Sequence, residues 1–589
     1  MVSHNLCLTQ GMYKKHSKKN GKSDQHMKKT NFHKKSLTLN VKHAGVLLVA
    51  ILLISTSIVT GTIKFGTDGS GQYWGIGGKN VITNSNGYEW EPTGANIQNA
   101  IDNLTDGGTV YLPGETMTIT DNIQLHDNIT LKGVGLKTLI RPNGGDYRIV
   151  LGHDPLLDSD DNIVISDLQF DGTNDSMYGI YCIRGDNIRV VNCRVINCVD
   201  DCIAILENSS NVIVKDNYCG GTVGGGSEYS SGIEVQDGAK QVIVENNFCI
   251  GRESGINIGS HASGDALTNV TVINNYCVNN SDTGINIQGD ASHTLKNVIV
   301  KNNIITTNHT SSYSAGINIR YMEHCVFDSN IIRKFDYGLY IKDASNIIIS
   351  NNDISQSGSS NKQNLYLDGS NQPDNCTIIG NIFDDGSISG RSHIIQGNTL
   401  RAGTSGELKI NSASRCIITG NKFVSSGIGL RVSPGFYLTI TDNLFAYSDT
   451  SNSNLRIESG HNITVADNLF IQNVRGIWIT AAIANLDVHD NKFLLNSEYD
   501  IYHPEYAKSV YDNLGYITEN GGANTSTDDG GTITHGLAGT PTYVICTCNE
   551  SAIVAVTNLG ASTFTVSIKD HAGNAVNGVT IFWRAFYEP

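Results

Sequence analysis

Proline and charged residues are scarce in this chain. Of its 589 residues only 9 are proline, and Asp, Glu, Lys and Arg together make up 16%. The low charge, with valine and isoleucine recurring throughout, excludes a disordered protein. The 62 glycines and the few prolines favour many short strands that are joined by tight turns.

Basic residues are also scarce beyond residue 43. Residues 1–43 hold ten Lys and Arg and one acid, Asp24, whereas the remainder holds 31 Lys and Arg against 55 Asp and Glu. The net charge of the remainder is therefore −24 (31 − 55). An acidic body repels the phosphate backbone, so we exclude nucleic acid as its partner.

Charge is missing altogether from AGVLLVAILLISTSIVTG, residues 44–61. This run is just long enough to span a bilayer as a transmembrane helix. Lys34, Lys35 and Lys42 precede it, which predicts a cytoplasmic basic tail, residues 1–43, and an extracellular body. No clear small-x-small cleavage site precedes Gly61, so we favour an uncleaved membrane anchor over a cleaved signal peptide. Asn-x-Ser/Thr sequons, such as those at Asn269 and Asn462, are consistent with a glycoprotein at the cell surface.

Several signatures of common sites are missing as well. The 13 cysteines lack the paired CxxC spacing of a zinc site. No Ser-His-Asp, HExxH, P-loop or GxGxxG signal occurs in a suitable context. The chemistry of the chain must therefore be sought in its repeats.

The sequence repeats with a period near 25 residues. Segments such as NVIVKDNYC (211–219), QVIVENNFC (241–249) and NVTVINNYC (269–277) align on one asparagine. Between them stand GI-x-I segments such as SGINI (254–258), which alternate apolar and variable residues as strands do. The aligned asparagines are Asn217, Asn247, Asn275, Asn303, Asn330, Asn352, Asn381, Asn398, Asn421, Asn443, Asn468 and Asn491.

This repeat predicts an all-β fold, a right-handed parallel β-helix in which one period is one coil. We expect each asparagine to adopt the unusual turn conformation and to hydrogen-bond its neighbours in the stack. The position two residues later is filled by cysteine, then isoleucine, then phenylalanine, from Cys219 to Phe493. Such a series is typical of a core column, so we expect most of the cysteines to be buried free thiols.

The ends of the repeat differ from its middle. Residues 95–112 begin with an amphipathic pattern that predicts an N-terminal cap helix. Residues 531–589 are strand-like but lack the coil motif, and we expect a small C-terminal β-sandwich there. The predicted domains are a basic tail (1–43), an anchor (44–61), a linker leading into the cap (62–94), the β-helix (95–510), a second linker (511–530) and the sandwich (531–589).

The stretch GGTVYLPGETMTITDNIQLHDNITLKGVG (107–135) resembles the first coils of the pectate-lyase-like superfamily, in its rhamnogalacturonase and epimerase-like branch. The resemblance covers about residues 95–500. The superfamily contains lyases, hydrolases, epimerases, tailspikes and binding proteins, so it implies the fold far more than the function.

One outward position of the GI-x-I strands is rich in polar and aromatic residues. Carboxamides hydrogen-bond hydroxyl groups and aromatic rings stack on sugar rings, so a column of both predicts a glycan groove. Our candidate substrate-binding residues in and beside this column are Tyr181, Asn257, Asn286, Asn318, Arg320, Tyr340, Lys342, Tyr366 and Trp478.

The stretch NCVDDCIAIL (197–206) is similar to the DDCxAI motif of polygalacturonases, whose carboxylates hydrolyse a glycosidic bond. The resemblance implies catalytic roles for Asp200 and Asp201, with Asp175 or Glu234 on adjacent coils as a partner. Inverting hydrolysis needs one protonated and one ionised carboxyl about 6.5–9.5 Å apart.

Other elements of the polygalacturonase pattern are changed. Ser254, Asn286 and Gln288 stand where it has His, Arg and Lys, which puts a polygalacturonate substrate in doubt. A calcium site and an Asp-Asp turn held by side-chain hydrogen bonds remain alternatives for these acids. The metal ligands, if calcium is bound, are left undefined.

Three classes of function compete. We rank slightly first a membrane-anchored extracellular protein that binds polysaccharide or cell-surface glycan, with or without processing it. The second is a glycan-active hydrolase, lyase or epimerase that uses Asp200 and Asp201. The third is a structural surface or tailspike-like protein that assembles through residues 531–589 as a homotrimer or lattice.

Overall fold

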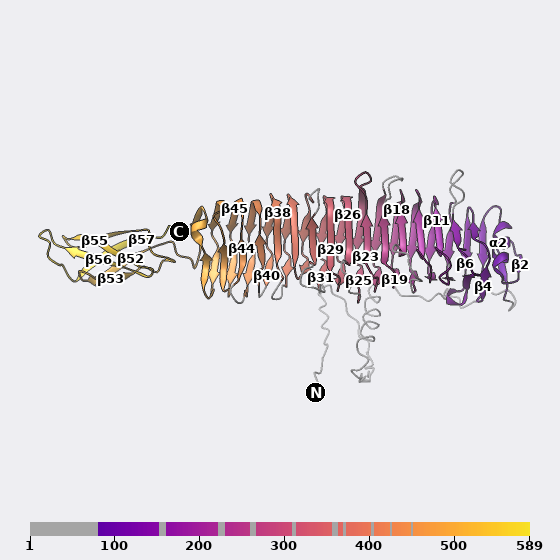
Figure 1. Ribbon diagram of the computed structural model, residues 1–589, viewed down its shortest axis with the longest axis horizontal. Helices are drawn as coiled ribbons and strands as arrows, with labels where there is room; N and C mark the ends of the chain where they lie inside the picture. Colours follow the sequence, from indigo (N-terminus) through magenta and orange to yellow (C-terminus); the bar gives the residue numbers. More distant parts are fainter. Residues whose placement is uncertain are drawn as a thin grey trace, which may run out of the picture. The chain divides into compact units, whose positions relative to one another are not determined.

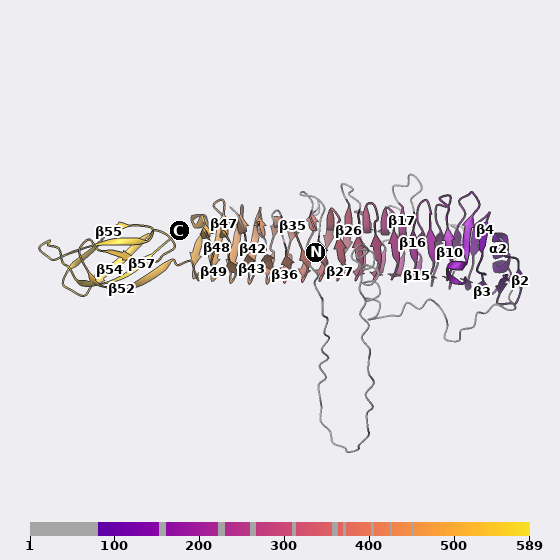
Figure 2. The same cartoon turned by 90° about the horizontal axis from the view of Figure 1, so that it is seen from below.

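The computed structural model describes residues 80–151, 161–221, 230–259, 267–308, 314–355, 363–368, 373–401, 406–424, 427–448 and 452–588. Nearly all of them up to residue 514 belong to a parallel β-solenoid, in which each strand pairs with the equivalent strand of the next coil. Figures 1 and 2 show these strands lying side by side along the solenoid, with α2 (Gly94–Asp102) at its N-terminal end. The predicted all-β solenoid is thus confirmed.

The strands form three stacks, which we call faces 1, 2 and 3 in the order in which a coil visits them. Faces 1 and 2 join in one 35-stranded sheet, which also contains the short strands β1 (Ile82–Asn84) and β2 (Glu89–Trp90), and face 3 is a separate 16-stranded sheet.

Face 1 contains β5 (Ile123–Leu125), β8 (Ile149–Leu151), β11 (Ile180–Ile183), β14 (Ile203–Leu206), β17 (Ser231–Gln236), β20 (Ser254–Gly259), β23 (Thr283–Gln288), β26 (Ala315–Glu323), β29 (Tyr337–Ser345), β32 (Leu365–Asp368), β35 (Gly386–Arg391), β38 (Leu408–Ser414), β41 (Leu430–Val432), β44 (Ser453–Ile457), β47 (Arg475–Ile479) and β50 (Tyr499–Tyr502).

Face 2 contains β3 (Gly108–Tyr111), β6 (Ile129–Lys132), β9 (Val164–Ser166), β12 (Arg189–Val191), β15 (Ser210–Lys215), β18 (Lys240–Glu245), β21 (Thr268–Ile273), β24 (Leu295–Lys301), β27 (Val326–Asp328), β30 (Ile348–Ser350), β33 (Thr377–Ile379), β36 (Ile394–Gln396), β39 (Ile417–Thr419), β42 (Gly435–Thr441), β45 (Gly460–Ala466), β48 (Ala484–His489) and β51 (Ser509–Tyr511).

Face 3 contains β4 (Thr116–Ile119), β7 (Leu139–Pro142), β10 (Gln169–Asp171), β13 (Arg194–Ile196), β16 (Tyr218–Gly220), β19 (Phe248–Ile250), β22 (Tyr276–Val278), β25 (Ile304–Thr306), β28 (Ile331–Arg333), β31 (Asp353–Ser355), β34 (Ile382–Phe383), β37 (Thr399–Leu400), β40 (Lys422–Val424), β43 (Leu444–Ala446), β46 (Leu469–Ile471) and β49 (Lys492–Leu494). Short 3₁₀ helices occur at η3 (Gly135–Lys137) and η4 (Pro504–Tyr506).

The cap helix begins at Gly94, one residue before the predicted range. Thr93 is its N-cap, and its side chain accepts a hydrogen bond from the backbone N–H of Asn96. The apolar face of α2 is buried through Ile97, Ala100 and Ile101. This helix therefore covers the first coil of the core, as a solenoid end requires.

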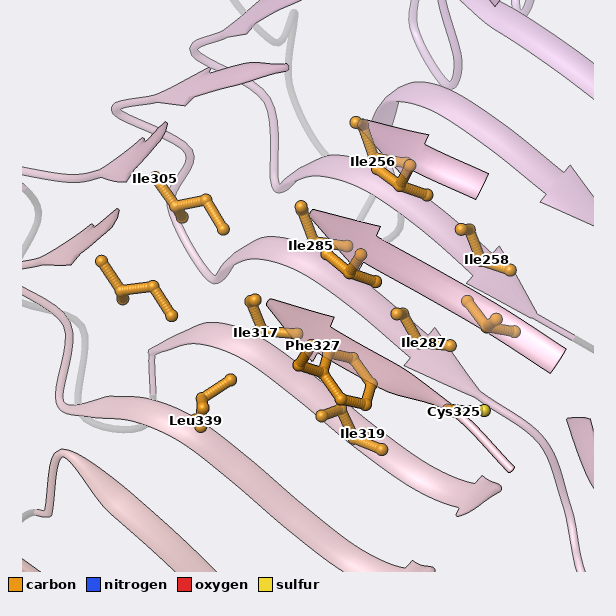
Figure 3. Close-up of a cluster of buried hydrophobic side chains, with 14 of the residues drawn as sticks. Ile256, Ile258, Ile285, Ile287, Ile305, Ile317, Ile319, Cys325, Phe327 and Leu339 are labelled. Atoms are coloured by element: carbon orange, nitrogen blue, oxygen red, sulfur yellow. The ribbon is translucent and has the colours of Figure 1, made fainter. Parts of the chain in front are cut away.

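The core is a set of apolar columns in register. Figure 3 shows Ile256, Ile285, Ile317 and Leu339 above one another on successive coils. The predicted column from Cys219 to Phe493 is buried throughout, and Phe423, Phe445 and Phe470 stack with ring centroids 4.8 Å apart. The twelve cysteines within the described ranges are free, and ten of them are buried. Burial of the repeat cysteines as free thiols is confirmed.

The asparagine column forms a continuous hydrogen-bonded ladder. In a typical step, the Asn303 side chain donates to Val272 O at 3.0 Å and to Asn330 Oδ1 at 3.0 Å. Asn303 Oδ1 in turn accepts from the backbone N of Asn275 at 2.9 Å and from its side chain at 3.1 Å. The same pattern continues through Asn513, one step beyond the predicted column.

The turn conformation, however, is one residue away from the expected position. Positive φ occurs at the residue before each ladder asparagine, as at Asn246 (φ 55°) and Asn302 (φ 55°). This residue turns the corner, which leaves the ladder asparagine free to point its amide into the coil. Our expectation that the ladder asparagine itself takes the unusual conformation was wrong.

Beyond the solenoid, the chain forms two three-stranded antiparallel sheets. One contains β52 (Glu519–Thr527), β57 (Val579–Phe586) and β54 (Tyr543–Cys548), and the other contains β53 (Thr532–Thr534), β56 (Thr563–Lys569) and β55 (Ile553–Leu559). Buried residues of both sheets, among them Ile533, Phe564 and Ile581, share one apolar cluster. The strand β52 lies in the segment that we expected to be a linker.

Within the described ranges, no helix combines the length and the apolar composition that a bilayer crossing requires. The predicted tail (1–43) and anchor (44–61) lie outside these ranges.

Candidate functional site

Face 1 presents one outward residue per coil in continuous register, and we call this column the outer row. It runs through Tyr181, Ala204, Glu234, Asn257, Asn286, Asn318, Tyr340, Tyr366, Ser387, Lys409, Arg431, Arg456, Trp478 and Tyr502. Arg320 and Lys342 pair with each other beside it, two residues further along their strands. The predicted substrate-binding residues therefore do lie together on one face.

Sequence reasoning did not place Ser387, Arg431 and Tyr502 in the outer row. Their segments, GSISG, YDIY and LRV, depart from the GI-x-I pattern, so only the strand register identifies them.

At the N-terminal end of the row, Asp201 and Glu234 form a carboxyl pair. Asp201 is 1% exposed and Glu234 is 8% exposed. Burial, the charge of Glu234 and a hydrogen bond between the two side chains raise the pKa of Asp201 well above its usual range. Asp201 Oδ1 also accepts the backbone N–H of Ser231 at 2.7 Å. The pair therefore favours sharing one proton over carrying two negative charges.

Two tyrosines lie near this pair, and an arginine lies over their rings. Burial and the charges of Asp200, Asp201 and Glu234 raise the pKa of Tyr178. The Tyr178 and Tyr181 ring centroids are 4.9 Å apart, and the Arg148 guanidinium lies 5.0 Å and 4.9 Å from them. We call Arg148, Tyr178, Tyr181, Asp201 and Glu234 the acid end. Tyr178 and Arg148 belong to loops, outside the periodic strands.

The Asp200–Asp201 turn is fixed by a buried cation from two coils further on. Arg252 has no exposed surface, and its guanidinium donates to the backbone oxygens of Asp200 and, at 2.8 Å, Cys198. The backbone N–H of Asp200 donates to Met177 O at 2.9 Å. These contacts hold the strand entrance through backbone groups of the motif, and the Asp200 side chain is half-buried.

Asp175 lies in the connection before β11. Its side chain is exposed and accepts a hydrogen bond from the Thr173 hydroxyl at 3.0 Å. That contact fixes the local turn, and it gives Asp175 no partner in the acid end.

The middle of the outer row is an amide ladder that begins at Glu234. The Asn257 side chain donates to Glu234 Oε1 at 3.0 Å, Asn286 donates to Asn257 at 2.8 Å, and Asn318 donates to Asn286 at 2.7 Å. Each half-buried amide keeps a second N–H and a lone pair for other partners. This segment can therefore both donate to and accept from hydroxyl groups.

Three tyrosines follow the amides. The rings of Tyr340 and Tyr366 stack with centroids 5.2 Å apart, and Tyr337 lies 5.1 Å and 5.6 Å from them. The Arg320 guanidinium is 5.6 Å from the Tyr340 centroid. The Tyr366 hydroxyl donates to Asp368 Oδ2 at 2.7 Å, and burial together with that carboxylate raises the pKa of Tyr366. We call Tyr337, Tyr340 and Tyr366 the tyrosine cluster.

The C-terminal end of the row combines arginines with aromatic rings. Arg456 lies 4.4 Å from the Trp478 ring centroid, and Arg475 lies 5.0 Å from it. Carboxylates offset these cations, since Glu458 is 2.9 Å from Arg456 and Glu498 is 3.0 Å from Arg475. This end is therefore aromatic and polar but carries little net charge.

The lengths of the connections single out face 1. From β9 to β49 every connection from face 2 to face 3 has two residues, for example 302–303 between β24 and β25. Connections that enter face 1 range from two residues (384–385) to ten (221–230), and one that leaves it, 152–163, has twelve. Binding residues in repeat folds commonly gather beside such variable connections.

Metal binding finds no support in the side-chain geometry. Across the residues that the structure describes, no group of three or more His, Cys, Asp or Glu side chains is placed to hold a metal ion. Calcium therefore stays a prediction.

Comparison with known proteins identifies the fold family. The family described as "Right handed beta helix region" matches residues 255–391, 315–493 and 387–534, which together cover 280 of the 589 residues (534 − 255 + 1). No curated protein matches the chain.

Solved structures are similar only at low identity. A mutant tailspike protein of E. coli bacteriophage HK620 in complex with a hexasaccharide is 14% identical, with a TM-score of 0.39, over 84% of this chain and 89% of that one. The tailspike of Pseudomonas phage phi297 is 14% identical, with a TM-score of 0.33, over 84% and 92%. PfbA, a surface adhesin of Streptococcus pneumoniae, is 15% identical, with a TM-score of 0.32, over 69% and 89%.

The strand pairing and the family match lead to the same assignment. Every solenoid coil pairs in parallel with the next, and the matched residues begin at β20 and run to the end of the solenoid. Both indicate a right-handed parallel β-helix fold for the solenoid.

Proposed function

We propose that the outer row of face 1 binds a linear polysaccharide or cell-surface glycan along the solenoid axis. The observation that carries this proposal is the alternation of ring clusters and hydrogen-bonding side chains within one column. Coils are about 4.8 Å apart, so the five steps from Tyr366 to Trp478 separate two aromatic sites by about 24 Å. An extended sugar chain spans such a distance more readily than a compact ligand does.

The charges of the row favour a neutral glycan. Two acids occupy one end, and carboxylates offset the arginines at the other. An anionic sugar chain would meet repulsion at Glu234 and little uncompensated positive charge near Trp478. Amides and tyrosines recognise hydroxyl groups without requiring charge.

We further propose that residues 44–61 anchor the protein in a membrane, with residues 1–43 in the cytoplasm and the solenoid outside the cell. The support is the apolar run and the lysines before it. Protease treatment of intact cells is expected to digest the solenoid and to protect a tag at residue 1. Protection of the solenoid would contradict this orientation.

Binding can be tested with the full chain in detergent and a panel of soluble neutral and acidic polysaccharides. We expect a neutral member to bind, and Tyr340→Ala/Tyr366→Ala to weaken its binding at least tenfold. The matched control is Tyr218→Ala/Tyr276→Ala, which removes two half-buried tyrosines from face 3. No binding by any member, or an equal loss in both variants, would refute the proposal.

A glycan-active hydrolase is the second candidate, and the raised pKa of Asp201 favours it. The geometry limits this candidate, because the Asp201 and Glu234 side chains are in hydrogen-bond contact. Retaining glycosidases separate their two carboxyls by about 5–5.5 Å and inverting ones by about 6.5–9.5 Å. A hydrolase would therefore rely on Asp200 together with the Asp201–Glu234 pair as a shared acid.

Product analysis separates the two functions. Incubation with the same polysaccharides is expected to release no new reducing ends. New reducing ends that disappear in Asp200→Asn would replace binding with hydrolysis as the function of face 1.

A further inference from the structure

Face 2 carries a long file of exposed β-branched residues that the outer row does not use. One outward position on eleven successive coils is always isoleucine, valine or threonine. We call this file the stripe: Ile213, Ile243, Thr271, Ile299, Val326, Ile348, Thr377, Ile394, Ile417, Thr439 and Thr464. Five of its isoleucines are exposed, for example Ile348 at 43% and Ile417 at 45%.

The residues beside the stripe make face 2 nearly neutral. The rows two residues before and two after it contain three cations, Lys215, Lys301 and Arg415, and two anions, Glu245 and Asp328. The sum is +1 (3 − 2), on a body whose net charge is −24. Four of these five charges are also offset within the chain, because Lys215 is 3.0 Å from Glu245 and Lys301 is 2.9 Å from Asp328.

The dimensions of this surface suit a protein partner. Ten steps of about 4.8 Å give a length of about 48 Å, and five residues of strand give a width of about 13 Å. The flat footprint is roughly 600 Å², close to the roughly 800 Å² that each partner contributes to a stable interface. Within this footprint the isoleucines and valine of the stripe form the apolar centre and the polar residues beside them form a rim, an arrangement typical of protein interfaces.

We infer that face 2 is the site at which a second copy of this chain packs, stripe against stripe. A second copy has the same coil spacing, so its side chains can fit between those of the first along the whole stripe. Face 2 is nearly neutral on a body whose net charge is −24, so two copies that meet there avoid the repulsion that the net charge of the whole protein would cause. The contact is independent of the outer row, which lies on another face.

The test is the association state of the full chain in detergent, measured by sedimentation velocity. The protein is produced without glycosylation, because Asn269 and Asn462 beside the stripe stand in Asn-x-Thr sequons. We expect a reversible dimer, and Ile299→Lys/Ile394→Lys to raise its dissociation constant at least tenfold. Ile299→Thr/Ile394→Thr, which keeps the β-branched shape, should raise it less.

The matched control is Ile331→Lys/Val424→Lys on face 3. These residues are 40% and 38% exposed, against 40% for both Ile299 and Ile394. The control pair is expected to leave the dissociation constant unchanged. A photo-reactive benzoylphenylalanine at position 299 should cross-link to face 2 of another copy.

Three results would overturn the inference. The first is a monomeric wild-type chain. The second is a dimer that the face 2 and face 3 lysine variants weaken equally, or that neither variant weakens. The third is cross-linking to another face or to residues 519–588. The last two would place self-association in another part of the chain.

Discussion

The two-residue turn between faces 2 and 3 and the outer row of face 1 occur on the same coils, yet one repeats and the other changes. The turn has an asparagine at its second position on every coil from Asn217 to Asn491, with the same hydrogen bonds each time. The outer row passes from acid to amide to tyrosine to arginine over the same coils. A position that only supports the fold has one good solution, so it repeats, whereas a position that faces a ligand is free to differ.

The comparison predicts that insertions will have the largest and most unequal effects. Four residues, Gly-Ser-Gly-Ser, placed between Asn302 and Asn303 should prevent cooperative folding, because they separate two coils of the ladder. The same insertion between Ala291 and Ser292, both exposed in the connection that leaves face 1, should leave the thermal midpoint within a few degrees. Circular dichroism melts measure both. Equal damage at the two places would break the comparison.

Single asparagine substitutions should show the same contrast on a smaller scale. Asn303→Ala leaves the backbone N–H of Asn275 and Val272 O unpaired in the interior, and we expect it to lower the free energy of unfolding by about 3 kcal/mol. Asn286→Ala removes a half-buried amide from the outer row and should lower it by less than about 1 kcal/mol. Urea denaturation distinguishes these values, and similar losses would show that the outer row is as structural as the ladder.

The acid end should show itself in the pH dependence of stability. The pKa of Asp201 is raised in the folded state, so the fold binds its proton more tightly than the unfolded chain does. The free energy of unfolding is therefore expected to fall as the pH rises above about 3.9, the pKa of Asp in an unfolded chain. The fall is about 1.4 kcal/mol per pH unit and ends when the folded pKa is reached. Asp201→Asn keeps the shape of the protonated side chain and should remove most of this fall.

This pH test has its own control. Asp328 has a pKa lowered to about 2 by Lys301, Ser350 and Asn351, so its contribution is present above its unfolded pKa and is lost as the pH falls toward 2. Asp328→Asn should therefore lower the free energy of unfolding at neutral pH. It should leave unchanged the loss of stability that Asp201 causes as the pH rises above about 3.9. A wild-type stability that is flat between pH 4 and pH 8 would contradict the shared proton.

Trp478→Leu should have the smallest effect on stability and a larger one on binding. Its ring interacts with Arg456 and Arg475 at a partly exposed site, where such contacts contribute about 0.5–1 kcal/mol. We expect a loss of that size in urea denaturation, and at least a tenfold weaker affinity for the glycan that wild type binds. Unchanged affinity would shorten the binding site to the tyrosine cluster and the amides.

Much of the fold was predictable because the repeat is periodic. Alternation in the GI-x-I strands fixes which residues point outward, so most of the outer row and the core column from Cys219 to Phe493 could be read directly. The amphipathic pattern of Ile97, Ala100 and Ile101 was enough for the cap helix. These features depend on neighbours in sequence or on a constant period.

The site was less predictable, because its connections are not periodic. The contacts of Tyr178 and Arg148 with the acid end depend on loop paths that no repeat constrains. Arg252 reaches back two coils to Asp200 through the interior, and sequence spacing gives no sign of that. The hydrogen bond between Asp201 and Glu234 requires the register across a ten-residue connection. The position of positive φ was misjudged for a different reason, since asparagine is common at both turn positions and only burial separates them.

The ladder also gives the molecule a direction of assembly. Each asparagine points both its backbone N–H and its side-chain N–H at the oxygen of the following coil, as Asn217 does toward Asn247. A chain that emerges from the ribosome with its N-terminus first would therefore always end in a coil with two unused donors. Those donors are a template for the next coil, so synthesis and folding can proceed in the same direction, one coil at a time.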